Sequence, residues 1–283
     1  MGLWDSFGQQ VVSGSMEQKR SRFHDYSHAL EYDRKAAKSD IRMQLVPRLV
    51  ESLEFQGNER VLDLATGTGR FARPVAQHLK GGKIVGLDEA VAMLRVAKEQ
   101  KEKEPIRGFL STAGSAEAFP FRAGSFDRIF TVFALHHFGN PPLMMREAHR
   151  VLKPGGRFAI LDPVVAAAED SLDEAIHDLI NQILRSAHGD YFHYHSAVDI
   201  QDLLSRAGFH VIRADLHSFA VDQEGMDGIP TGRHWLEVAE RMQDESPELK
   251  QRFEEKYFRY EKKGDKTHVQ GSFEYALVCG EKR

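Results

Sequence analysis

The stretch between residues 57 and 86 constrains the fold most, because it has the pattern of a strand, a tight turn, a helix and a second strand. The residues from Arg60 to Leu64 favour a central strand that is buried on both faces. The loop Ala65-Thr-Gly-Thr-Gly69 removes side chains where the chain must turn sharply. A helix is expected from about Arg70 to Leu79, and Lys83 to Leu87 supplies the next strand. This order is typical of the βαβ unit of a parallel sheet.

The glycine loop and the end of the second strand predict a ligand. A loop without side chains lets the backbone approach a ligand, and a carboxylate that ends the next strand can accept hydrogen bonds from both ribose hydroxyls. Asp88 holds that position, 19 residues beyond Gly69. Gly67, Gly69 and Ala72 also satisfy the pattern G-x-G-x-x-A. The loop therefore predicts a nucleoside cofactor, which is either a dinucleotide or an adenosine-containing sulfonium.

The composition is that of an ordinary globular protein. Hydrophobic residues make up 41% and charged residues 28% of the 283 residues, so we expect a large buried core, in one enzyme domain with insertions or in two domains. The chain has 38 Lys and Arg against 42 Asp and Glu, and its pI is near 6.4. This balance argues against nucleic acid as a partner, because that binding relies on excess positive charge.

The sequence also favours a cytoplasmic location. The longest apolar stretch, Phe158 to Ala168, is interrupted by Asp162 and Pro163, and it is shorter than the ~20 residues that span a bilayer. We therefore expect no membrane span. Residues 1–14 lack a basic region followed by an apolar core, so no secretory signal is expected. The single cysteine, Cys279, excludes an internal disulfide and favours a reducing compartment.

The run from Val61 to Gly69 resembles the first motif of class I S-adenosylmethionine-dependent methyltransferases, which has an acidic residue four positions before the first glycine. Asp63 occupies that place. Four further segments match the same family in order, and they are most similar to its ubiquinone/menaquinone biosynthesis branch. These segments are Val85–Leu94, Gly114–Phe121, Phe126–Phe138 and Arg150–Phe158. The resemblance covers about residues 59–163. It implies an α/β fold with a Rossmann-like, seven-stranded, mostly parallel sheet, an antiparallel last strand and helices on both faces.

The resemblance implies S-adenosylmethionine as the cofactor and assigns residues to it. Asp63 and the loop backbone would hold the methionine end, Asp88 would bind the ribose, and Met93 would pack against adenine. Met93 is equally consistent with a core residue, because it lies on an apolar helical stripe. Ser115 departs from the family pattern, which usually has aspartate there, and a neutral hydroxyl makes the weaker adenine contact. The expected cofactor-binding residues are Asp63, Ala65, Thr66, Gly67, Gly69, Asp88, Glu89, Met93, Ser115 and Ala116.

The rest of the chain continues the sheet and interrupts it with helical segments. We expect helices over Pro142–Leu152 and Ser196–Gly208, and strands over Phe158–Leu161, Phe209–Val221 and Gly271–Gly280. Two apolar stripes predict further helices: Ala175, Leu179, Ile183 and Leu184, and then Trp235, Val238 and Met242. The chain divides into an N-terminal helical cap (1–55), the cofactor-binding core (56–163), a helical cap insertion (164–195), a core continuation (196–221), a helical lid insertion (222–270) and the last strand (271–283).

The cap segments fall where ligands bind in open α/β sheets, beside the carboxyl ends of the strands. Their many aromatic residues predict a small, apolar or aromatic acceptor, although the same rings would also serve to pack the cap. These residues are Tyr191, Phe192, Tyr194, Trp235, Phe253, Tyr257, Phe258 and Tyr260.

Histidine supplies the candidate catalytic base, since its ordinary pKa of ~6.5 suits proton removal from an acceptor. His136 is preferred because it follows a strand that is expected to point at the cofactor, and His193, His195 and His234 are the alternatives. We expect no metal site, because no Cys or paired acidic residue accompanies the histidines at ligand spacing.

Two other functions stay open at this point. A nicotinamide-dependent oxidoreductase would use the same glycine loop, and a non-catalytic module could bind S-adenosylmethionine without transferring methyl. The sequence does not identify the acceptor, the methylated atom (O, N or C) or the oligomeric state.

Overall fold

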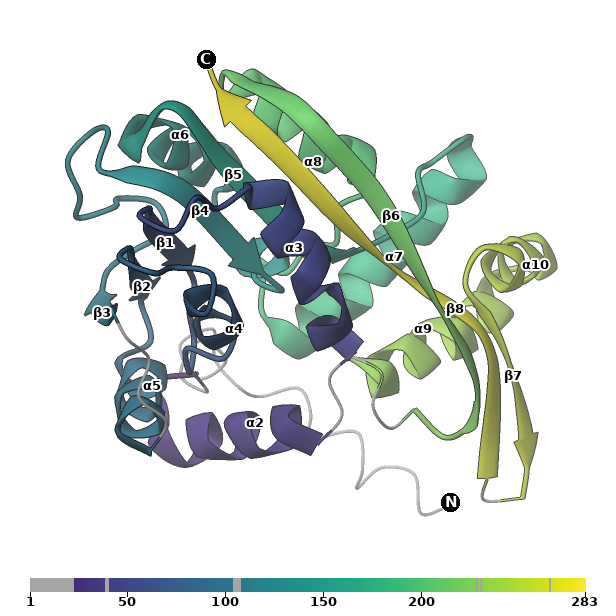
Figure 1. Ribbon diagram of the computed structural model, residues 1–283. Helices are drawn as coiled ribbons and strands as arrows, with labels where there is room; N and C mark the ends of the chain where they lie inside the picture. Colours follow the sequence, from purple (N-terminus) through teal and green to yellow (C-terminus); the bar gives the residue numbers. More distant parts are fainter. Residues whose placement is uncertain (1–22, 39–40, 104–107, 227–228, 230, 265) are drawn as a thin grey trace.

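The computed structural model describes residues 23–38, 41–103, 108–226, 229, 231–264 and 266–283 (Figure 1). Its helices are α2 (Tyr26–Lys38), the 3-10 helix η1 (Ile41–Leu45), α3 (Val46–Leu53), α4 (Ala72–Ala76), α5 (Val91–Lys103), the 3-10 helix η2 (Leu135–His137), α6 (Pro141–Val151), α7 (Ser171–His188), α8 (Ala197–Arg206), α9 (Gly232–Glu245) and α10 (Pro247–Lys256). Its strands are β1 (Arg60–Leu64), β2 (Lys83–Asp88), β3 (Phe109–Ala113), β4 (Phe126–Val132), β5 (Leu152–Val164), β6 (Phe209–Glu224), β7 (Phe258–Lys263) and β8 (Lys266–Lys282).

The strands form one sheet in the order β3-β2-β1-β4-β5-β8-β6, and β7 pairs with β8 off this path. The strands β1 to β5 are parallel to one another, whereas β8 runs antiparallel to β5, β6 and β7. This arrangement confirms the predicted α/β fold class with its antiparallel last strand. The described sheet has eight strands, one more than predicted, because the helical lid insertion contains β7.

Several predicted elements are found with close boundaries. β1 covers the predicted residues, and β2 ends at Asp88 as expected. The helix α8 begins with a capping box, in which the Ser196 hydroxyl accepts from the Asp199 backbone and the Asp199 carboxylate accepts from the Ser196 backbone. β5, β6 and β8 are each longer than predicted.

Two helix predictions are corrected by the structure. The helix after the glycine loop begins only at Ala72 and is five residues long, because Gly69 has a φ of 73° and Pro74 has no N–H to donate to the Arg70 carbonyl. In α7, Leu184 of the predicted stripe is buried and Leu179 and Ile183 are half-buried, but Ala175 is exposed and the face centres on Ile176 and Ile180. The same face also buries Asp173 and Asn181, so hydrophobicity alone misplaces it.

Helices cover both faces of the sheet (Figure 1), and apolar clusters lie between these helices and the sheet and under the cap. The residues of α6 and α8 pack on one face, and those of α3 and α4 pack on the other. A third cluster joins α7, α9 and α10 to Phe258 of β7 and to Val269 and Phe273 of β8. A fourth joins α2 to α5, through Ala29 and Met93 among others.

A buried carboxylate ties α7 to α10. Asp173 is 1% exposed, and it accepts from Lys256 at 2.6 Å and from Arg252 at 2.9 Å. Burial alone would raise the pKa of Asp173, but Lys256, the Glu169 N–H and Arg252 outweigh it and lower the pKa to about 2. The ion pairs therefore stabilise the cap above the ordinary carboxyl pKa, and this stability is lost as the pH falls through about 2.

We expect Asp173→Asn to lower the free energy of unfolding by about 2 kcal/mol at pH 7, and by much less near pH 2. Urea titration at both pH values measures the difference. Asp170→Asn is the matched control, because asparagine also caps the start of α7 and Asp170 is exposed. An equal cost of Asp173→Asn at both pH values would contradict the assignment.

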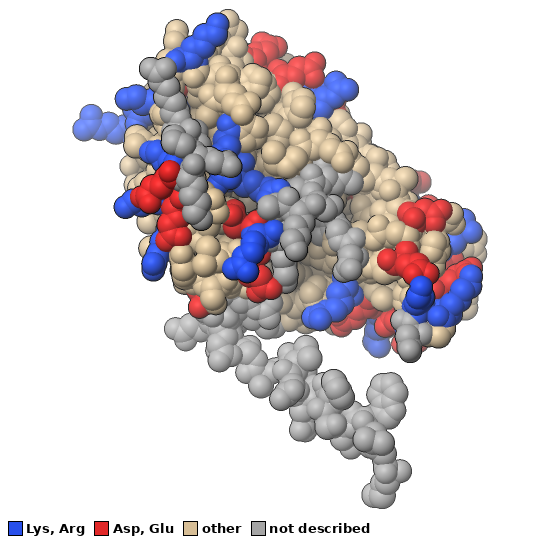
Figure 2. Space-filling view, turned by 60° about the horizontal axis from the view of Figure 1, so that its bottom comes forward, with Lys and Arg blue, Asp and Glu red and all other residues tan. Residues whose placement is uncertain are grey.

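The surface in Figure 2 mixes acidic and basic side chains. At the end of the molecule formed by α9, α10 and β7, the pairs Arg241–Glu245 and Lys262–Glu240 bring opposite charges together. Among the described residues, no helix is long and apolar enough to cross a membrane.

Candidate functional site

The glycine loop turns at the carboxyl ends of β1 and β2. The Thr66 N–H donates to the Leu87 carbonyl at 3.0 Å, and the Gly69 N–H donates to the Thr66 carbonyl at 2.9 Å. Gly67 has a φ of 55°, which favours glycine, and a Cβ placed on it would meet no described atom within 4 Å. The outer side of the loop is therefore bare backbone that a ligand can approach.

Asp88 clamps this loop. One carboxylate oxygen accepts from the Gly67 N–H at 2.8 Å, and the other accepts from the Ala90 N–H at 2.8 Å. Burial raises the pKa of Asp88, and these two N–H groups oppose the rise. Because each carboxylate oxygen has a second lone pair, Asp88 can hold the loop and still accept two hydroxyls of a ligand.

Asp63 also holds the loop, from beneath. Its buried carboxylate accepts from the Thr66 hydroxyl at 2.6 Å, and burial raises its pKa to about 7. Gly86 makes room for this contact, because a Cβ there would lie 2.7 Å from the Thr66 side chain. Asp63 thus fixes the shape of the loop through Thr66.

The helix α2, which precedes the glycine loop in the chain, packs against it. The Asp33 carboxylate accepts from the Thr68 hydroxyl at 2.7 Å and from the Gln100 amide at 2.7 Å. The Tyr26 hydroxyl donates to Glu99 of α5 at 2.5 Å. These contacts close one side of the candidate site with residues that the sequence analysis did not identify, since no motif marks them.

The other expected cofactor residues lie along the same edge. Met93 is 3% exposed and packs with Ala29 of α2, while Glu89 is exposed. The exposed Ser115 uses its hydroxyl to accept from the Glu117 N–H at 3.1 Å. Ala116 is half-buried against the main core. Ala65 has a φ of 55°, which completes the turn after β1.

His136 lies on η2, directly after β4, and a carboxylate at the end of β5 orients it. The Asp162 oxygen Oδ2 lies 2.8 Å from the His136 Nδ1 and also accepts from the His136 backbone N–H at 3.1 Å. Both side chains are buried. Burial raises the pKa of Asp162, and the N–H groups of Ala134, Leu135 and His136 oppose this rise by donating to the ionised carboxylate. A proton on Nδ1 directed at Asp162 leaves Nε2 as the basic nitrogen of the ring.

The alternative bases lie at different distances from this pair. The His193 N–H donates to the His136 carbonyl at 3.0 Å, and the His193 ring contacts that of His195. Burial lowers the pKa of His195 to about 4, so this ring is a weak base. His234 lies where α9 meets α7, and its Nδ1 is 3.2 Å from His188 Nε2.

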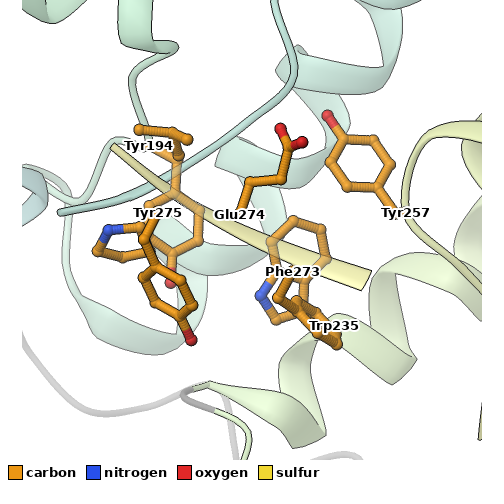
Figure 3. Close-up of a pocket in the computed structure, with 8 residues that line it drawn as sticks. Tyr194, Trp235, Tyr257, Phe273, Glu274 and Tyr275 are labelled. Atoms are coloured by element: carbon orange, nitrogen blue, oxygen red, sulfur yellow. The ribbon is translucent and has the colours of Figure 1, made fainter. Parts of the chain in front are cut away.

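Beyond this pair, aromatic rings surround a small recess at the end of β5 (Figure 3). Tyr194 and Trp235 stack with ring centroids 5.9 Å apart, and Trp235 meets Phe273 edge-on at 5.6 Å. Phe253 and Phe258 are fully buried in the cap, whereas Tyr191 is exposed. The recess is lined by Pro163, Val164, Tyr194, Trp235, Tyr257, Phe273, Glu274 and Tyr275.

Four residues of this region were not predicted from the sequence as site residues: Asp162, Phe273, Glu274 and Tyr275. A signal for Asp162 was present, since it is the carboxylate that interrupts the apolar stretch of β5. Within the described parts of the chain, no group of three or more His, Cys, Asp or Glu side chains could hold a metal ion.

Comparison with known proteins identifies one family. A family model described as "Methyltransferase domain" matches residues 55–213, more than half of the chain. The uncharacterized methyltransferase YcgJ of Bacillus subtilis is 31% identical over 131 residues, which are 46% of this chain and 51% of that protein. Its crystal structure superposes with a TM-score of 0.68 at 21% identity, covering 85% of this chain and 99% of the other, which supports the fold.

Two further relatives carry more specific names. The demethylmenaquinone methyltransferase of Thermus thermophilus is 36% identical over 115 residues, 41% of this chain and 52% of that protein. The ubiquinone/menaquinone biosynthesis C-methyltransferase UbiE of Pectobacterium carotovorum is 30% identical over 178 residues, 56% of this chain and 70% of that protein. The match thus spans only about half the length of YcgJ and of the Thermus relative.

Proposed function

The chain belongs to the methyltransferase domain family, and from this premise we propose that it is an S-adenosylmethionine-dependent methyltransferase. It transfers the methyl group directly, in line, to a small, apolar or aromatic acceptor. The observation that carries the proposal is the Asp88-clamped glycine loop at the strand ends, inside the segment that the family model matches.

The residues of the loop fit this cofactor. The bare face at Gly67 admits the methionine end, and the second lone pairs of Asp88 suit the two ribose hydroxyls. Met93, Glu89, Ser115 and Ala116 remain our proposal for the adenine end. When bound there, S-adenosylmethionine would supply an electrophilic methyl group, so the protein itself must align the acceptor and exclude water.

The acceptor class is supported by the aromatic recess beside Asp162. Tyr194, Trp235 and Tyr257 are buried against one another, so an acceptor would enter by parting these rings, which would then offer it flat apolar contact. The names of two relatives refer to menaquinone compounds, which are aromatic when reduced. We propose the recess and the adjoining cap, residues 164–195 and 222–270, as the acceptor side of the site. That the chain acts in the cytoplasm and binds no nucleic acid stays a prediction.

His136 is the proposed catalytic base. Asp162 fixes its ring and stabilises the positive charge that forms when Nε2 takes a proton from the acceptor. The deprotonated acceptor atom would then have a lone pair available for the methyl group of S-adenosylmethionine, and S-adenosylhomocysteine would be the leaving group. His195 is a poorer candidate because its pKa is about 4.

The family assignment gives no support to the nicotinamide-dependent alternative. The non-catalytic alternative is tested by turnover. The protein, labelled S-adenosylmethionine and a panel of hydroquinones, phenols and aromatic amines are incubated together, and mass spectrometry detects products that gain one methyl group. Tight cofactor binding without turnover on any acceptor would favour a binding module.

We expect the lid insertion to be needed for methyl transfer and not for cofactor binding. β6 and β8 pair at Glu224 and His268, and the Gly225 N–H donates to the Thr267 carbonyl at 2.7 Å, so an Asn-Gly turn can replace residues 226–266. The shortened protein should bind S-adenosylhomocysteine within about fivefold of the full chain, because the loop contacts remain. It should lose turnover, because a wall of the recess is gone.

Trp235→Leu is the companion variant, because removal of the insertion also exposes the apolar face of α7. It leaves the insertion in place and should raise the acceptor KM with little change in cofactor affinity. Calorimetry and turnover are measured on the same preparations, and circular dichroism checks the fold. Full turnover in the shortened protein would place the acceptor elsewhere.

A further inference from the structure

The strand β6 forms a long outer edge of the sheet (Figure 1). It has 16 residues and pairs along one side with β8. No other described strand pairs with it, so the backbone groups of its outer side face away from the sheet. An edge of this length is a template for another strand, and proteins usually protect such edges with charges, proline or short length.

The protection is weak here over the middle of β6. The exposed positions Ile212, Ala214, Leu216, Ser218 and Ala220 alternate along the strand, and none is charged. Leu216 is 53% exposed and Ile212 is 39% exposed, which places both among the most exposed large apolar side chains of the described chain. The bulge between Val211 and Arg213 lies toward one end, and the strand is regular beyond it.

The same stretch is complementary to itself. In an antiparallel pair of two β6 strands centred on Leu216, each Leu216 meets its own copy and each Ala214 meets Ser218 of the second copy. On the other face, each Asp215 lies opposite His217 of the second copy, so no like charges face each other at the centre. Cross-strand apolar and opposite-charge pairs of this kind stabilise a sheet.

We propose that this chain forms a two-fold dimer in which β6 pairs with β6 of a second copy and the two sheets become continuous. The partner is the chain itself because in this register the uncharged stripe meets its own copy, and each Asp215, which also pairs with Arg213 of its own strand, lies opposite His217 of the second copy. The proposal is independent of the methyltransferase assignment.

Analytical ultracentrifugation tests the dimer. The wild type should sediment as a dimer at micromolar concentration. Leu216→Lys should raise the dimer dissociation constant by at least about tenfold, because it places two like charges on the axis. Val198→Lys is the matched control, since Val198 is an equally exposed apolar residue on α8, and it should stay dimeric. A wild-type monomer at about 100 μM, or a dimer unaffected by Leu216→Lys, would overturn the proposal.

Disulfide formation tests the register. Only a residue on the two-fold axis lies opposite its own copy, and the native Cys279 is buried. Leu216→Cys should therefore form a cross-linked dimer under mild oxidation, whereas Ala214→Cys and Ser218→Cys should cross-link much more slowly. Equal cross-linking at the three positions, or none at Leu216→Cys, would contradict the pairing.

Discussion

His136→Asn is expected to lower kcat by about 10²–10⁴-fold with any acceptor that the wild type methylates, because the variant removes the nitrogen that takes the acceptor proton. The affinity for S-adenosylhomocysteine should change by less than about threefold, since Asp63 and Asp88, which hold the loop, remain in place. Fixed-time assays measure kcat and calorimetry measures the affinity, both on the same preparation.

The control for this variant is His193→Asn, which changes a neighbouring histidine with an exposed ring. It should keep kcat within about threefold of the wild type. Asp162→Asn should lower kcat as well and alter the pH profile, because it removes the group that orients His136. A normal kcat for His136→Asn, or a large loss for His193→Asn, would reassign the base.

Asp88→Ala is expected to weaken cofactor binding by about ten- to a hundredfold, or roughly 1.5–3 kcal/mol. The variant removes the acceptors for two ribose hydroxyls and also releases the backbone clamp on Gly67 and Ala90. Calorimetric titration with S-adenosylhomocysteine measures the loss. Asp202→Ala, an exposed carboxylate on α8, is the control and should bind normally. Unchanged affinity in folded Asp88→Ala would remove Asp88 from the site.

The sequence predicted that the glycine loop and Asp88 meet, because this meeting depends on local signals. The loop from Ala65 to Gly69 and the strand end at Asp88 belong to one βαβ unit, so short spacings predict their meeting. The structure brings the Asp88 carboxylate onto the Gly67 N–H at 2.8 Å. The start of α8 was predicted for the same reason, since its capping box of Ser196 and Asp199 spans one helical turn.

Contacts between distant parts of the chain were not readable. Asp33 bonds to Thr68, 35 residues away, and Asp162 orients His136 from 26 residues away. Neither pair has a spacing rule, because the packing of whole elements brings them together. The buried Asp173 also shifted the predicted face of α7, since a polar residue with two cationic partners occupied a core position.

The lid insertion shows the limit of periodicity. The stripe of Trp235, Val238 and Met242 correctly predicted α9. The charged run after Tyr260 gave no strand signal, yet β7 pairs with β8 there from Phe258 to Lys263. Side chains at a sheet edge face solvent on most sides, so their sequence does not need to alternate in polarity.

Calorimetric titration of the purified protein with S-adenosylhomocysteine and, separately, with NAD tests the central claim most directly. We expect one S-adenosylhomocysteine site per chain, weakened by Asp88→Ala, and no comparable binding of NAD. Binding of NAD at the same loop, or no binding of S-adenosylhomocysteine and S-adenosylmethionine to the folded protein, would contradict it.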